Sequence, residues 1–220
     1  MAIFDFKLAC GPRTYHFYEG YIKEFRDKLY LTSFPREDER EPFENIEARV
    51  CSPGSYPMTN ILLAVDHDNG KLAGGCITDF HFDCDSALPI YLVVGKEYRR
   101  QGLGGMLLKN AVNQGLVKHC FVEVDNPTLI NEDGSPISPT DRVEIYQKWG
   151  FRTLPIKYYQ PPLGRGLNYE TNLMLMHRGE KLTKDELKKF LSCFYRGLGY
   201  EKSEKLDEMF EEIEETFVYL

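Results

Sequence analysis

The sequence lacks the features that mark membrane, secreted and metal-binding proteins. No apolar run approaches the roughly 20 residues that span a bilayer, and residues 1–7 carry charge where a secretory signal needs an apolar stretch. The six cysteines form no Cys-x-x-Cys pair, and no histidine stands at ligand spacing beside them. These absences predict a soluble cytoplasmic protein with reduced thiols, no bound metal and no membrane partner.

A basic surplus is also missing. The net charge of −7 comes from 27 basic and 34 acidic residues, and residues 201–220 contribute −6 of it, with eight acids against two lysines. The rest of the chain is almost neutral, at −1, whereas a nucleic-acid binder usually carries a basic excess. We therefore expect no nucleic-acid partner. With 220 residues, 42% of them apolar, the chain has the size of one compact domain with an appendage.

Two helices are predicted ahead of the first long strand. Residues 14–29 place apolar side chains at three- and four-residue spacing, with charged side chains between them. The charged stretch 36–41 then precedes Phe43, Ile46 and Val50, which also follow helical spacing. The charges therefore fit the solvated face of a second helix.

The middle of the chain predicts a sheet. Residues 61–65 and 71–82 are strand-like runs joined by a turn that ends in Asn69-Gly70, which is a strong hairpin signal. A third strand, a helix opened by glycines and an apolar strand are expected next, over residues 88–94, 102–117 and 120–124.

The last third of the chain predicts further helices and strands. Ser138 is followed by Pro139 and, two residues later, by an acid, a pattern that caps a helix start. This helix is expected over 139–149, with Gly150 directly behind it. Two strands and two helices are expected after it, over residues 151–159, 169–176, 183–195 and 203–217. The pattern predicts an α/β fold, a twisted mixed sheet with helices on both faces, and a helical pair at its end.

A basic, glycine-rich turn follows the strand at 88–94. It combines two arginines with backbone N–H groups at a helix start, a geometry that binds a diphosphate. A P-loop is excluded because Gly104-Gly105-Met106 offers neither a lysine nor a hydroxyl. A dinucleotide fingerprint is excluded because Leu107 stands where the third glycine is needed. A helix start softened by glycines, without a ligand, is the alternative.

The spacing Arg99-x-x-Gly102-x-Gly104 directly after a strand resembles the acyl-CoA pyrophosphate loop of the GCN5-related N-acetyltransferase (GNAT) superfamily. The order of predicted elements over residues 10–177 is also that of the family. A second motif, Tyr146-Gln147-Lys148-Trp149-Gly150-Phe151, is similar to the Tyr-x-x-x-Gly-Phe that ends the fourth helix of many members. The two motifs together favour an acyl-CoA-binding protein over a helix start without a ligand.

The resemblance implies an acetyl-CoA cosubstrate and assigns its binding residues. The backbone of the third strand would hydrogen-bond the pantetheine arm, and the turn would bind the pyrophosphate. The implied contacts are Leu92, Val93, Val94, Arg99, Arg100, Gln101, Gly102, Leu103, Gly104 and Gly105. Tyr146 matches the family's general acid, which protonates the departing thiolate. The structural alternative for Tyr146 is an aromatic side chain packed on the buried face of a helix.

The general base is less well marked. Some relatives that modify proteins carry a glutamate on the third strand, where this sequence has Leu88, so we take Glu123 as the catalytic candidate. A carboxylate in an otherwise apolar strand costs on the order of several kcal/mol unless it is paired or functional. A structural salt bridge or a water relay is left open, and Asp125, His81 and Asp83 are weaker options.

The sequence departs from the family at one cofactor contact. Many members carry an asparagine seven residues before the tyrosine, but Pro139 stands there. Ser138 and Arg142 are candidates to replace it, although neither matches the family pattern.

The resemblance implies a GNAT-like acyl-CoA N-acyltransferase fold over residues 1–179 and a C-terminal helical extension over 180–220. The implied function is transfer of an acetyl group from acetyl-CoA to a primary amine by direct attack, on a small molecule or a protein. Acceptor choice would be set by the first two helices, the loop after Asp125 and residues 158–166. A non-catalytic acyl-CoA-binding or interaction module on the same fold is the alternative, and homodimerisation is left open.

Overall fold

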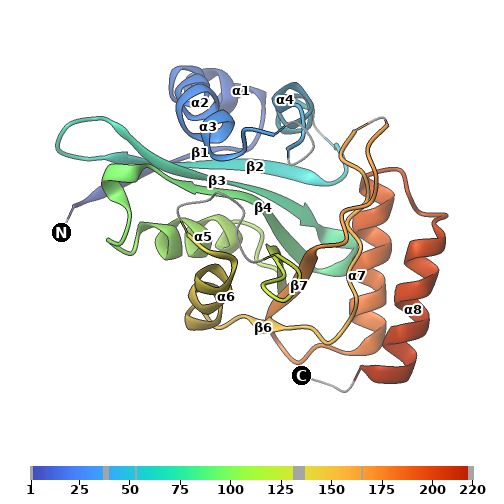
Figure 1. The fold of residues 1–220 in the computed structure, drawn as a ribbon. Helices are drawn as coiled ribbons and strands as arrows, with labels where there is room; N and C mark the ends of the chain where they lie inside the picture. The colour runs from blue at the N-terminus through green and yellow to red at the C-terminus, as the bar shows by residue number, and fades with distance from the viewer. Residues whose placement is uncertain (1, 37–39, 53, 131–136, 165, 218–220) are drawn as a thin grey trace. The chain divides into compact units, whose positions relative to one another are not determined.

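The computed structural model in Figure 1 describes most of the chain, namely residues 2–36, 40–52, 54–130, 137–164 and 166–217. The predictions for the acids at 37–39 and for the loop at 131–136 lie outside these residues. The described strands belong to a seven-stranded sheet in the order β1-β2-β3-β4-β5-β7-β6.

The chain divides into two compact units. The first comprises Met1–Phe80 and Ala87–Leu116, and the second comprises His81–Ser86 and Val117–Leu220. The division at 1–179 and 180–220 that the sequence suggests stays a prediction.

In chain order, the elements up to residue 116 are β1 (Phe4–Ala9), α1 (Pro12–Phe17), α2 (Glu19–Phe25), the π-helical turn η1 (Arg26–Tyr30), α3 (Leu31–Ser33), α4 (Phe43–Cys51), β2 (Met58–Asp66), β3 (Leu72–His81), the 3₁₀ turn η3 (Phe82–Cys84), β4 (Ser86–Val94), the 3₁₀ turn η4 (Lys96–Tyr98) and α5 (Leu103–Asn113).

β1 is an edge strand that the sequence prediction omits. It pairs antiparallel with β2, from Phe4 opposite Asp66 to Ala9 opposite Ile61. Apolar and polar side chains alternate from Phe4 to Leu8, which is the period of a strand. So short a segment is stable only because β2 provides its hydrogen-bonding partners, and that pairing is a tertiary contact.

The hairpin of β2 and β3 confirms the Asn-Gly prediction. The carboxylate of Asp66 accepts hydrogen bonds from the backbone N–H of Asp68 at 3.0 Å and from Asn69 Nδ2 at 2.9 Å. Gly70 closes the turn with a φ of 70°, a conformation that costs glycine little and other residues more. The turn chemistry therefore sets the register of the two strands.

One face of the first unit's sheet is covered by α1 to α4, and α5 lies on the other face (Figure 1). The single helix predicted over 14–29 is longer and interrupted in the structure, running from Pro12 to Ser33 through α1, α2, η1 and α3. Its apolar stripe still packs on the sheet: Ile22, Phe25 and Tyr30 are fully buried. Burying side chains of this size is worth about 1.5–3 kcal/mol each.

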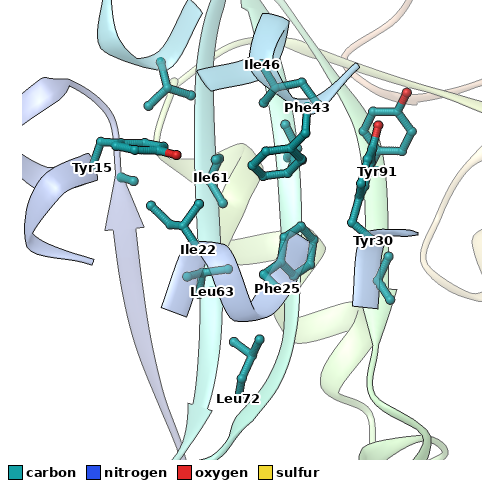
Figure 2. Close-up of a cluster of buried hydrophobic side chains, with 14 residues drawn as sticks. Tyr15, Ile22, Phe25, Tyr30, Phe43, Ile46, Ile61, Leu63, Leu72 and Tyr91 are labelled. Atoms are coloured by element: carbon teal, nitrogen blue, oxygen red, sulfur yellow. The ribbon is translucent and has the colours of Figure 1, made fainter. Parts of the chain in front are cut away.

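Figure 2 shows the core on the helix-covered face, where Tyr30 lies beside Tyr91 of β4. Their rings meet edge to face with centroids 4.8 Å apart. Both hydroxyls bond the backbone of Glu41: Tyr30 donates to its carbonyl at 2.6 Å, and Tyr91 accepts from its N–H at 2.8 Å. These two phenols therefore tie the segment before α4 to the sheet.

The second unit contains β5 (His119–Asp125), α6 (Pro139–Lys148), β6 (Arg152–Thr153), β7 (Leu173–Gly179), α7 (Lys184–Gly197) and α8 (Glu204–Thr216). β5 and β7 pair antiparallel, with Glu123 opposite Leu175. The strand predicted over 151–159 is wrong in length, because β6 has only two residues. Pro155 has no N–H for a ladder, and two residues later the backbone N–H of Lys157 donates instead to Glu212 of α8 at 2.9 Å.

Both predicted C-terminal helices are present, and Figure 1 shows α7 and α8 side by side. Lys188 Nζ lies 2.5 Å from Glu214 Oε1 across this pair. α7 begins with a complete capping box, in which Thr183 and Glu186 bond each other's backbone N–H groups. None of the described helices is long and apolar enough to cross a membrane.

Two buried histidines, one on β5 and one on β7, lie side by side. His119 Nδ1 and His177 Nε2 are 3.0 Å apart, and the side chains are 2% and 5% exposed. Burial, reinforced by His119, lowers the pKa of His177 to about 4, while Glu186 opposes the shift. His177 is therefore neutral at pH 7, and the imidazole pair shares a hydrogen bond that does not require a charge.

We expect this pair to make folding sensitive to acid. The unfolded chain takes up a proton near the ordinary histidine pKa of about 6.5 and folded His177 only near 4, so stability falls as the pH drops through that window. The loss from His177 is about 2 kcal/mol between pH 7.5 and pH 5. Urea unfolding measures the free energy of unfolding at both pH values, and its slope against pH should be smaller in His177→Gln than in wild type. His67→Gln, which changes an exposed histidine, should keep it. An unchanged slope in His177→Gln would refute this assignment.

Candidate active site

The turn after β4 is held to the sheet of the first unit at both ends. The Gly95 N–H donates to the carbonyl of Ala73 on β3 at 2.8 Å. Arg99 Nε donates to the carbonyl of Val94, the last residue of β4, at 3.1 Å. Between them η4 makes one tight turn. The backbone from residue 99 onward is thus carried on a rigid strand end.

Two residues of the turn adopt left-handed backbone conformations. Arg100 has a φ of 61° and Gly102 a φ of 82°. Gly102 is the N-cap of α5, where no side chain caps the helix and no acid stands in the first turn. A Cβ added at Gly102 would meet no atom within 4 Å, so space is open in front of the helix start. The N–H groups of the first turn and the positive helix end therefore suit an anion.

The predicted pantetheine contacts lie on β4, just before this turn. Val93 is buried in the core beneath α1 to α4. Leu92 and Val94 point to the other face, where they pack against the cluster formed with α5. Their side chains are thus structural, and a ligand would be held by backbone groups alone. The turn is likewise predicted to bind a ligand through backbone N–H groups, at Gln101, Leu103, Gly104 and Gly105.

Tyr146 lies near the end of α6 in the second unit. Its ring meets those of Trp149 and Phe151 edge to face, with centroids 5.3 and 5.5 Å apart. The carbonyl of Tyr146 accepts the N–H of Phe151 at 3.0 Å. Gly150, between these residues, has a φ of 87° and turns the chain back from α6 toward β6. The Tyr-x-x-x-Gly-Phe motif is therefore one packed unit that sets the tyrosine ring.

The candidates to replace the missing asparagine have structural partners. Ser138 Oγ accepts the N–H of Asp141 at 3.1 Å, so it caps α6 as the sequence predicts. Arg142 forms an ion pair with Asp125 at the end of β5 and donates to the carbonyl of Ile137 at 3.3 Å. Asp125 is therefore paired rather than available as a second base, and the cofactor role of Ser138 and Arg142 stays a prediction.

Glu123 lies in the middle of β5 and is half-buried. Its Oε1 accepts a hydrogen bond from Tyr158 Oη at 2.5 Å and another from Gln160 Nε2 at 2.9 Å. Both donors are neutral, whereas the sequence suggested a cation as the structural partner. No short-range pattern in the sequence pairs these residues, because the chain between β6 and β7 brings them to β5.

The candidate site residues lie within a part of the sequence that matches a family model. Residues 59–153 match the family model of the acetyltransferase (GNAT) domain. This stretch of 95 residues is therefore similar to a GNAT acetyltransferase domain. The matched region runs from β2 to β6 and includes the turn after β4, Glu123 and Tyr146. No curated protein matches the sequence.

Solved structures show the fold. A GNAT-family protein from Bacteroides thetaiotaomicron is 20% identical, covers 83% of this chain and 94% of its own, and has a TM-score of 0.61. An acetyltransferase from Bacillus subtilis in complex with CoA is 16% identical over 71% of this chain and 91% of its own, with a TM-score of 0.47. The ribosomal-protein-S18-alanine N-acetyltransferase from Escherichia coli is 18% identical over 83% and 99%, with a TM-score of 0.46. The predicted GNAT-like α/β fold with a C-terminal helical pair is confirmed.

The weaker candidates for the general base, His81 and Asp83, contact side chains of α7. The His81 ring lies edge-on to Phe190 and Phe194 of α7, with centroids 6.1 and 6.4 Å away. The Asp83 carboxylate lies 2.5 Å from the Arg196 guanidinium of the same helix. Both side chains thus help to attach the segment 81–86 to α7.

The second unit also has a small cavity of about 280 Å³ beside the predicted acceptor segment. Its lining is mostly apolar and includes Asn126, Leu154, Tyr158 and Met174. Within the described part of the chain, no group of three or more His, Cys, Asp or Glu side chains is arranged to hold a metal ion.

Proposed function

We propose that this protein transfers an acetyl group from acetyl-CoA to a primary amine. The observation that carries the proposal is the uncapped start of α5, which follows β4 through a turn with two left-handed residues and two arginines. Such a helix start attracts a diphosphate through its N–H groups and its dipole. The family match over residues 59–153 supports the same function.

The turn would take the pyrophosphate of the cosubstrate on the backbone N–H groups of residues 100–105. The missing side chain at Gly102 lets an anion approach the backbone, since a Cβ there would project into the open space. The exposed Arg100 side chain adds positive charge, while Arg99 is tied to Val94. The backbone of residues 92–94 would hydrogen-bond the pantetheine arm.

The proposed chemistry is direct attack. Glu123, alone or through a water molecule, accepts a proton from the acceptor's ammonium group, and the resulting amine nitrogen forms a bond to the acetyl carbonyl carbon. The carbon–sulfur bond breaks, and Tyr146 gives its proton to the departing thiolate. The newly bonded nitrogen then loses its second proton, which restores the Tyr146 phenol, and Glu123 releases the first proton to solvent. The products are an N-acetylated amine and CoA, and no oxidant or metal is required. Whether the acceptor is small or a protein is decided by a screen of both classes.

The turn is tested by changing Gly102 to leucine. We expect Gly102→Leu to weaken CoA binding at least about tenfold, because the side chain occupies the approach to the N–H groups and strains a positive φ. Isothermal titration calorimetry measures the affinity.

Gly70→Leu is the matched control. Gly70 has a φ of 70° and equally open surroundings, but it lies in the β2–β3 turn. Both variants should lose similar stability, and only Gly102→Leu should lose CoA affinity. Equal CoA affinity in the two variants would contradict the assignment. Binding without turnover on any amine would indicate a non-catalytic acyl-CoA-binding module.

A further inference from the structure

Two hydrogen bonds converge on one carboxylate oxygen of Glu123. Tyr158 and Gln160 both donate to Oε1, at 2.5 and 2.9 Å. Tyr158 is only 2% exposed, so its hydroxyl has exchanged water for this carboxylate. Two donors fix both the rotation of the carboxylate about its axis and the direction in which it points.

The segment that carries these donors is itself held on both sides. The backbone of Gln160 exchanges two hydrogen bonds with Glu170, each of 3.0 Å. The carbonyl of Tyr159, between the two donors, accepts the hydroxyl of Tyr195 on α7 at 2.6 Å. The donors therefore occupy fixed places before any ligand binds, which is the condition for preorganisation.

We propose that Tyr158 and Gln160 are positioning residues, which orient the Glu123 carboxylate and keep it ionised to receive the proton of a cationic amine. This inference rests on the proposed function, since it gives Glu123 the role of base. It assigns no contact between Tyr158 or Gln160 and the reacting atoms.

The electrostatics of the cluster agree with this role. Burial raises the pKa of Tyr158 well above its usual value, and the Glu123 carboxylate raises it further, so the phenol stays a neutral donor. The interaction is reciprocal, so the neutral phenol in turn stabilises the charged form of Glu123. Tyr195 of α7 is another titratable group near the cluster, and its pKa is raised by burial first and by neighbouring groups that include Glu123. Both tyrosines are neutral at pH 7.

The decisive measurement does not need turnover. The side-chain carboxyl ¹³C signal of Glu123 in the labelled full chain, assigned by its loss in Glu123→Gln, is followed against pH. We expect Tyr158→Phe to raise its titration midpoint by about one pH unit, because the charged form loses a donor. Gln160→Leu, at a half-buried position, should also raise the midpoint, because it removes the second donor.

Tyr30→Phe is the matched control, since it removes a buried hydroxyl that bonds the carbonyl of Glu41 in the first unit rather than Glu123. It should lose similar stability and leave the midpoint unchanged. The inference is overturned if the Glu123 midpoint is the same in folded Tyr158→Phe and Tyr30→Phe, or in Gln160→Leu and wild type.

Kinetics then separates this inference from the proposed function. The acidic limb of kcat/KM should move to higher pH in Tyr158→Phe by the shift seen in the NMR titration, and the shift should vanish in the Glu123→Gln background. A protein without turnover on any amine refutes the proposed function, while the titration still decides whether the two donors hold Glu123 ionised. An unshifted acidic limb in an active Tyr158→Phe variant refutes the positioning role.

Discussion

Tyr146→Phe should lower kcat by about 100- to 10,000-fold, which is the usual cost of removing a general acid. The ring stays in place because its contacts with Trp149 and Phe151 are made by carbon atoms. Binding of CoA and thermal stability should therefore change little. Steady-state kinetics with calorimetric CoA titration separates the loss in kcat from any loss in binding.

The matched control for this substitution is Tyr200→Phe. Tyr200 is also a half-buried tyrosine that meets a neighbouring ring, Tyr169, edge to face at 5.9 Å. Its hydroxyl has no part in the proposed chemistry, so turnover should match wild type. If Tyr146→Phe also stays within about twofold of wild type, its hydroxyl takes no part in catalysis and the ring serves packing alone.

Glu123→Gln should lower kcat/KM by about 100-fold or more and remove the acidic limb of its pH profile, because an amide cannot accept the amine proton. The fold should survive. The amide oxygen can still accept hydrogen bonds from Tyr158 and Gln160, and neither donor carries a charge that the substitution would leave unpaired. Activity, and not stability, is thus the expected loss.

A structural carboxylate of the same unit provides the comparison. Glu186 Oε2 accepts the backbone N–H of Thr183 at 2.9 Å in the capping box of α7. Glu186→Gln should therefore lower the melting temperature and keep the acidic limb of kcat/KM. If Glu123→Gln instead behaves like Glu186→Gln, with a lower melting temperature and an intact pH profile, Glu123 is structural and a water relay or another group is the base.

Much of the fold was predictable because its signals are local. The Asn69-Gly70 turn, the Ser138 cap and the Gly150 stop act through hydrogen bonds and φ angles within a few residues, so each is visible in a short window. The strand predicted over 151–159 fails for the opposite reason. Whether an apolar segment continues a ladder depends on a partner strand, and Pro155 ends that pairing here.

The sequence by itself determined the helix start after β4 and the position of the Tyr-x-x-x-Gly-Phe motif at the end of α6, because both rest on spacing along one strand end or one helix. Only the tertiary structure decided the surroundings of Glu123. Its donors come from 35 and 37 residues away, along a segment of irregular backbone that no periodicity describes. Hydrogen bonds between distant residues form when the packing of α7 and β7 fixes that segment, and a sequence carries no local signal for such packing.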